Sequence, residues 1–252
     1  MAANTLAEIE TPLAVPVYVG RQAIYDRDLN VVAYELLYRD SAQNCASFDD
    51  GDRATGELLL NTFVEIGVDE IAGDLPVFVN VSPRFIVEGH CRQLPRDRVV
   101  IEALQDMRPS DEIVAALADL RKQGYRIALD DFVYDDSFAE IVPLSEIVKL
   151  DVLELGREKL VDQVAALQQF NVQLLAEKVE TYVEFDFCRE LGFTLFQGYF
   201  ESRPRIVSGQ RIPSDRLTTL QLISELSNPL VELSEIEQLV SRDATLSYKL
   251  LK

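Results

Sequence analysis

The sequence predicts an α/β fold, a closed (β/α)8 barrel followed by the start of an all-helical domain, and three observations lead to it. Apolar runs rich in β-branched residues alternate with segments of helical period along most of the chain. Several of these runs are apolar throughout, as is typical of strands buried on both faces of a parallel sheet. There are about eight such runs, and 252 residues suffice for one barrel and part of a second domain.

The first two strands are expected to form an antiparallel hairpin. The runs PVYVGRQAIYD and NVVAYELLYR are joined by a short polar turn from Asp26 to Asn30. A helix is expected next, at about residues 52–66. The remaining strands are then expected at 76–82, 99–104, 125–132, 147–152, 172–179 and 193–199.

Segments of helical period separate most of these strands. For the helix expected at 110–124, Ser110 is a suitable N-cap and Gly124 a suitable C-cap. An open doubly wound sheet is the competing fold, but no strand is followed by a GxGxxG or GxxxxGK[ST] loop, which weakens a nucleotide-binding fold of that type. The expected helices after the hairpin region are 110–124, 137–143, 157–170 and 182–192.

The two ends of the chain differ from this pattern. Residues 1–14 are expected to be a disordered lead, and 15–210 to form the barrel domain. Residues 211–252 contain only helical segments, and the helical pattern still runs at Lys252 without a C-cap. We therefore expect 211–252 to be the first helices of a second domain that is incomplete in this chain.

Composition restricts the class of function. The net charge of −19 opposes the phosphate backbone, so no DNA-binding surface is expected. Cys45, Cys91 and Cys188 are far apart, which disfavours both disulfides and structural zinc. No apolar run approaches the ~20 residues that span a bilayer, and the N-terminus does not resemble a signal peptide. A cytoplasmic protein without membrane attachment is expected.

Polar side chains stand at the ends of seven expected strands, where chemistry is located in barrels of this type. Oxygen ligands without Cys or His suit hard cations such as Mg²⁺, Ca²⁺ or Mn²⁺. The alternative is that each side chain only caps a helix or bonds its own loop. The residues are Glu35, Asn80, Glu102, Asp130, Asp131, Lys149, Asp151, Glu177 and Gln197.

The order of these motifs resembles the EAL family of cyclic di-GMP phosphodiesterases. The resemblance covers about residues 15–205 and is carried by YELLYR, NVS, Glu102, DDF, KLD, AEKVET and QGYFESRP. It implies a TIM-like barrel whose first strand is antiparallel, and hydrolysis of cyclic di-GMP to pGpG over divalent metal ions. It also leaves a homodimer open.

The resemblance assigns roles by position. Glu35, Asn80, Glu102 and Asp130 would be metal ligands, and Asp131 and Glu177 would bind a metal or its water. Lys149 would assist that water and Gln197 would support it. Arg39 would contact a ligand phosphate, and Gln22 would lie beside the ligand. An active enzyme would need Mg²⁺ or Mn²⁺, whereas an inactive one would need no bound ion.

The C-terminal helices resemble a second family, the HDOD domain of bacterial signalling proteins. IPSDRLTTLQLISEL and IEQLVSRDATLSYKLLK carry this resemblance, and YELLYR is similar to the branch that joins EAL-like and HDOD domains. Other signalling proteins are therefore the expected partners of the helical part.

Several positions depart from the family pattern. After DDF the family usually has a Gly-Thr-Gly-Tyr-Ser-Ser loop, and here it is Val133–Phe138 (VYDDSF). Gln105 replaces an acidic residue, Glu201 replaces an aromatic one, and Lys178 is a further change beside Glu177 that could pair with a carboxylate in place of a metal. Asp135 and Asp136 are expected to form a solvated acidic turn rather than replacement ligands.

These departures favour a degenerate EAL domain that acts as a cyclic di-GMP sensor or as a protein-interaction module coupled to HDOD. The alternative is an active metal-dependent phosphodiesterase. A third hypothesis is a barrel whose ring of polar residues only caps helices.

Overall fold

The structure is a computed structural model that describes residues 15–39, 58–59, 61–103, 109–200 and 205–211. Within it, Tyr18–Ser208 forms one compact unit. The expected disordered lead, the HDOD-like helices from 212 onward, Gln105 and Glu201 lie outside the described residues. No helix in the described ranges is long and apolar enough to cross a membrane.

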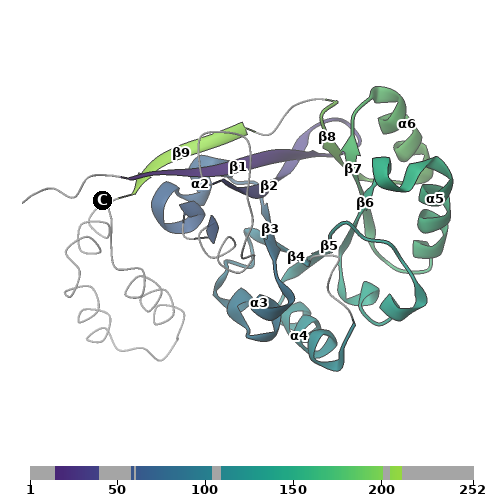
Figure 1. Ribbon diagram of the computed structural model, residues 1–252, viewed down its shortest axis with the longest axis horizontal. Helices are drawn as coiled ribbons and strands as arrows, with labels where there is room; N and C mark the ends of the chain where they lie inside the picture. Colours follow the sequence, from purple (N-terminus) through teal and green to yellow (C-terminus); the bar gives the residue numbers. More distant parts are fainter. Residues whose placement is uncertain (1–14, 40–57, 60, 104–108, 201–204, 212–252) are drawn as a thin grey trace, which may run out of the picture. The chain divides into compact units, whose positions relative to one another are not determined.

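The described chain contains the predicted closed barrel, in which β1 is the antiparallel strand (Figure 1). β1 pairs with both β2 and β8, which closes the sheet, and β2 to β8 follow one another in parallel. The α/β barrel fold and the N-terminal hairpin are thus confirmed. The strands are β1 Val15–Tyr25, β2 Val31–Arg39, β3 Val77–Val81, β4 Val99–Ala103, β5 Arg126–Leu129, β6 Ile147–Asp151, β7 Gln173–Val179, β8 Leu195–Gly198 and β9 Arg205–Arg211.

Helices α3 to α6 lie outside the strands in Figure 1. The sequence did not indicate α2, α3, η2 or β9, because these elements are short or lie outside the regular alternation. The expected helix at 137–143 is two 3-10 turns, η3 and η4. The helical elements are η1 Asn61–Ile66, α2 Val68–Ala72, α3 Pro83–Val87, η2 His90–Gln93, α4 Asp111–Lys122, η3 Asp136–Phe138, η4 Val142–Leu144, α5 Val152–Leu167 and α6 Tyr182–Leu191.

Helix α5 begins earlier than the sequence indicates. Asp151 is its N-cap, and its side chain accepts hydrogen bonds from the backbone N–H groups of Leu153 and Glu154. Gly156 then has a non-helical backbone with φ of 67°, which separates this first turn from the helical pattern that starts at 157. The expected start at 157 therefore marks the second part of a broken helix.

Helices α4 and α6 also have side-chain caps, and of the two caps predicted for α4 the N-cap Ser110 is confirmed whereas the C-cap lies one residue before the expected Gly124. The Ser110 hydroxyl accepts from the backbone N–H of Ile113 at the start of α4. At its end the cap residue is Gln123, and Gly124 follows with φ of +90°, a conformation that glycine adopts without strain. Thr181 and Glu184 form a reciprocal capping box at the start of α6.

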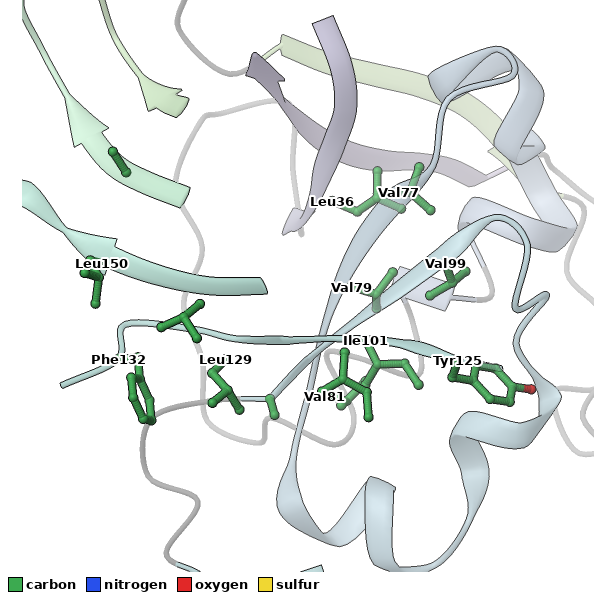
Figure 2. Packing of buried hydrophobic residues seen from close by; sticks show 14 of the residues in the cluster. Leu36, Val77, Val79, Val81, Val99, Ile101, Tyr125, Leu129, Phe132 and Leu150 are labelled. Carbon is green, nitrogen blue, oxygen red and sulfur yellow. The ribbon is translucent and has the colours of Figure 1, made fainter. Parts of the chain in front are cut away.

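The larger hydrophobic core lies between the strands and the surrounding helices. Residues of β2 to β5 that alternate along each strand belong to it, because successive side chains point to opposite faces of a sheet. Figure 2 shows part of this core, including Leu36, Val77, Val79, Val81, Val99 and Ile101.

A smaller core fills the inside of the barrel. One residue from each of β1 to β7 contributes to it, and Leu195 of β8 packs against it. Side chains from strands all around a closed sheet can meet only in its interior, so this cluster is the apolar floor of the barrel. The floor consists of Ile24, Ala33, Phe78, Val100, Ala128, Ile147 and Leu175.

Strand β7 is irregular where it carries candidate site residues. Its pairing with β8 shifts register between Ala176 and Val179, so Glu177 and Lys178 form a bulge. Across from the bulge, a Cβ atom added to Gly198 would lie 1.8 Å from the Val179 carbonyl oxygen. Only glycine therefore permits this close approach of β8 to β7.

Candidate active site

A layer of polar side chains lies directly above the apolar floor. Each strand from β2 to β8 supplies the residue two positions after its floor residue, and β1, which runs the other way, supplies Gln22 opposite Glu35. Because side chains alternate with a period of two, all eight face the barrel interior. We call this set the polar layer: Gln22, Glu35, Asn80, Glu102, Asp130, Lys149, Glu177 and Gln197.

Lys149 is the centre of the polar layer. Its Nζ atom lies 2.5 Å from Glu102 Oε1, 2.7 Å from Asp130 Oδ1 and 2.9 Å from Glu177 Oε1. Glu35 Oε2 lies farther away, at 3.6 Å. Four carboxylates thus surround one ammonium group, and the Lys149 side chain has no solvent exposure.

Glu35 is held by amide groups from both sides of the barrel. Asn80 Nδ2 donates to its Oε1 over 3.0 Å, and Gln197 Nε2 donates to its Oε2 over 2.6 Å. The carboxylate is therefore fixed in orientation without using the ammonium of Lys149. In metal sites, hydrogen bonds of this kind orient the side chains that ligate the metal.

Burial and mutual repulsion change the protonation of these groups. Desolvation raises the pKa of Glu102 well above its ordinary value, and it raises that of Glu177 to about 8. The pKa of Lys149 is also raised: burial alone would lower it, but the surrounding carboxylates outweigh that effect. The Lys149 ammonium therefore stays charged, and four carboxylates share this single positive charge.

The buried carboxylates also have unused oxygens. Among the described residues, Oε2 of Glu102 and Oε2 of Glu177 have no hydrogen-bond partner. One oxygen of each of Glu35, Glu102 and Asp130 lies within 4.8 Å of the others. A hard cation bound at about 2.1–2.5 Å from each oxygen needs separations of about 4–5 Å at most. The polar layer therefore fits a divalent cation in charge, donor type and size.

Asp131 and Lys178 form a second, more open group with Asp151. Lys178 Nζ bonds Asp151 Oδ2 and lies 3.7 Å from Asp131 Oδ1. Because the other oxygen of Asp151 caps α5, this carboxylate is fully engaged. Desolvation and the neighbouring Asp130 raise the pKa of Asp131. Asp131 thus stands beside the polar layer and pairs with a lysine.

The loop after Asp131 is anchored by Gln163 of α5 and by contacts between its own aromatic rings. The Tyr134 backbone N–H donates to Gln163 Oε1 over 2.6 Å, and Gln163 Nε2 donates back to the Tyr134 carbonyl over 3.3 Å. The rings of Phe132 and Phe138 meet edge to face with centroids 5.0 Å apart. The contribution of Gln163 could not be predicted from the sequence, because this residue lies 29 positions after Tyr134 along the chain, in α5.

The two acidic residues of that loop lie away from the carboxylate cluster. Asp135 accepts hydrogen bonds from the Ser137 backbone and hydroxyl, which lowers its pKa and starts η3. Both Asp135 and Asp136 are exposed. This arrangement agrees with the expected solvated acidic turn.

The structure brings together seven of the eleven residues singled out from the sequence, and another of them, Asp151, caps α5. Gln22 is half-buried and opposite Glu35 in register, and Asp131 lies to one side. Arg39 is the last residue of β2, and its side chain lies outside the described part of the structure. The seven in contact are Glu35, Asn80, Glu102, Asp130, Lys149, Glu177 and Gln197.

Helix capping accounts for little of this ring. The described caps of α3 to α6 are Ser82, Ser110, Asp151 and Thr181, so Asp151 alone among the strand-end residues has that role. Seven residues of the polar layer instead form one connected network inside the barrel.

Residues 57–204, more than half of the chain, match the model of the EAL domain. The chain belongs to the EAL domain family. The matched range does not include β1 and β2, so the placement of Glu35 in an EAL site rests on the barrel geometry.

Two curated relatives share more than a third of their aligned residues with this EAL chain. Cyclic di-GMP phosphodiesterase CdgJ of Vibrio cholerae is 36% identical over 238 residues, covering 93% of this chain and 55% of the relative. Uncharacterized protein YuxH of Bacillus subtilis is 35% identical over 244 residues, covering 94% and 59%. The chain thus spans a little over half the length of these relatives.

Solved structures of EAL proteins share the fold. BlrP1 of Klebsiella pneumoniae, solved as a complex with manganese and cyclic di-GMP, has a TM-score of 0.61 and 21% identity, covering 80% of this chain and 63% of that one. At that identity the likeness supports the barrel fold.

Proposed function

We propose that this EAL domain hydrolyses cyclic di-GMP to linear pGpG with the help of a divalent cation, Mg²⁺ or Mn²⁺. The observation that carries the proposal is the cluster of Glu35, Glu102 and Asp130, whose oxygens lie within 4.8 Å of one another in a buried layer. The identity of 36% with a relative named as a cyclic di-GMP phosphodiesterase supports the substrate.

Glu35, Asn80, Glu102 and Asp130 are the proposed ligands of the cation. When bound there, the cation would offset the negative charge of a phosphodiester and lower the pKa of a water molecule. The polar layer would meet this role with little rearrangement, because Asn80 and Gln197 already orient the Glu35 carboxylate. The substrate dianion needs that positive charge, since the whole chain carries a net charge of −19.

Glu177 would accept the proton of the attacking water, and Lys149 would hold the surrounding carboxylates. The raised pKa of Glu177 indicates a carboxyl that exchanges a proton near neutral pH, and its Oε2 atom is unused. In the proposed reaction a water oxygen attacks phosphorus, Glu177 accepts the water proton, and the bond from phosphorus to the 3′ oxygen breaks. The released 3′ oxygen would take up a proton from solvent, Glu177 would return its proton to solvent, and Lys149 would keep the carboxylates in place throughout.

A second candidate is a receptor that binds cyclic di-GMP without turnover and passes the signal to an HDOD-like segment. The loop 132–138 supports this candidate, because it lacks the glycines that the family resemblance leads us to expect and is held by two hydrogen bonds between Tyr134 and Gln163. In this proposal residues 211–252 would begin the coupled helical domain.

One experiment separates the two functions. The full chain is incubated with cyclic di-GMP and either Mn²⁺ or Mg²⁺, and the nucleotides are separated by chromatography. The phosphodiesterase proposal predicts pGpG that is absent with chelator and in Glu35→Gln, and present in the exposed control Glu158→Gln. Binding of cyclic di-GMP by calorimetry without product would support the receptor, and neither binding nor product would refute both.

A further inference from the structure

Two non-glycine residues with left-handed backbones face each other beside the polar layer. In the described ranges only Leu29, Asp131 and Lys178 combine a side chain with positive φ, and the last two have φ of 46° and 54°. Such conformations cost about 1–3 kcal/mol each and gather at functional sites. Leu29 lies in the β1–β2 turn, whereas Asp131 and Lys178 approach each other across the site.

The bulge in β7 puts Lys178 in this position. Glu177 remains in the polar layer, while the register shift before Val179 turns Lys178 toward the ends of the neighbouring strands. Lys178 bonds Asp151, which ends β6, and approaches Asp131, which follows β5. One side chain thus links the ends of three strands.

We propose that the Lys178 ammonium is a built-in cation that replaces a second divalent ion at Asp131 and Asp151, so that each chain binds one divalent cation. The inference rests on the proposed metal-dependent function. The site would take one divalent ion, and Lys178 would hold the Asp131 and Asp151 carboxylates in position.

The charges of the two groups support this division. In the polar layer, carboxylates outnumber the single ammonium four to one, so a divalent cation is still needed there. Beside it, Asp131 and Asp151 already share Lys178. The Lys178 ammonium thus lies between these two carboxylates, where a second cation would otherwise be needed.

A second divalent ion would need ligands that Lys178 occupies. Paired catalytic metals lie about 3.5–4 Å apart and share carboxylates between them. Asp131, next to Asp130, is the available carboxylate for such a pair, and Lys178 Nζ lies 3.7 Å from its Oδ1. Asp151 cannot substitute, because both its oxygens are bonded. Like-charge repulsion and missing ligands therefore both disfavour a second ion.

The test is the number of Mn²⁺ ions bound per chain. The full chain is titrated with Mn²⁺ by calorimetry, and electron paramagnetic resonance then distinguishes isolated ions from coupled pairs. Wild type should bind one ion with the spectrum of isolated Mn²⁺. Lys178→Gly, which suits the left-handed backbone, and Lys178→Gln should each bind two ions with a coupled spectrum.

Lys178→Arg is the matched control, because it keeps the positive charge and should still bind one ion. Two ions in wild type, or one ion in both neutral variants, would overturn the inference while leaving the proposed function standing. No ion in wild type would overturn the proposed metal site itself and, with it, this inference. Thermal unfolding of each variant verifies that the fold is kept.

Discussion

The Nζ atom of Lys149 lies 2.5 Å from Oε1 of Glu102, and neither side chain has any solvent exposure. Burial of an ion pair is costly, and it stabilises a protein only when the pair has close to ideal partners. Here the surplus of carboxylates leaves the group incompletely neutralised, with Oε2 of Glu102 unpaired. Such an arrangement is better explained by a requirement for a cation than by stability.

Lys149→Met should destabilise the metal-free protein. Removal of the ammonium leaves four carboxylates with no central positive charge, and breaking a buried pair in this way costs about 3–5 kcal/mol. Mn²⁺ should restore more stability to this variant than to wild type. Urea unfolding with chelator and with Mn²⁺ measures both effects, and the exposed Lys122→Met is the control. An equal Mn²⁺ effect in variant and wild type would contradict the account.

Glu102→Gln should have the opposite effect on the metal-free protein. It relieves repulsion from Glu35 and Asp130, and Lys149 keeps its other partners. The free energy of unfolding with chelator should stay within about 1 kcal/mol of wild type or rise. The stabilisation by Mn²⁺ should be lost. A marked loss of stability in chelator would instead indicate a purely structural role for Glu102.

The metal-free protein should become less stable as the pH rises. Desolvation raises the pKa of Glu177 from 4.5 to about 8, so between these values the folded chain holds a proton that the unfolded chain has released. The free energy of unfolding should therefore fall across this range, by up to about 1.4 kcal/mol per pH unit, and level off above it. Urea titrations in chelator should show a flatter profile for Glu177→Gln, and identical slopes would refute the assignment.

Asp135→Ala should leave the metal site intact. Asp135 is exposed and caps η3 through Ser137, so its loss should loosen the turn with little effect on global stability. Mn²⁺ affinity by calorimetry should equal that of wild type and of the neighbouring Asp136→Ala variant. A weaker affinity in either variant would mean that this loop supplies a ligand.

The sequence predicted the barrel and the polar layer because both follow from local patterns. In the strand PVFVNVS the valines face the outer core, whereas Phe78 of the apolar floor and Asn80 of the polar layer face the barrel interior. Periodicity alone therefore places Phe78 and Asn80 on one face. The order of the motifs then indicated the family.

Other features depend on contacts that no local pattern reveals. The bulge at Glu177 and Lys178 arises from the close approach of Gly198 in another strand. The anchoring of Tyr134 needs Gln163, which is distant in sequence. The early start of α5 follows from the Asp151 cap and the break at Gly156, which a search for one continuous helical period passes over. The helix expected at 52–66 is described only in part, as η1.

Anomalous scattering from a crystal grown with Mn²⁺ tests the central claim most directly. The account predicts a single strong peak per chain, bounded by Glu35, Asn80, Glu102 and Asp130, with Lys178 still bonded to Asp151. A polar layer without a peak at saturating Mn²⁺, closed only by the contacts of Lys149 to the carboxylates, would contradict it.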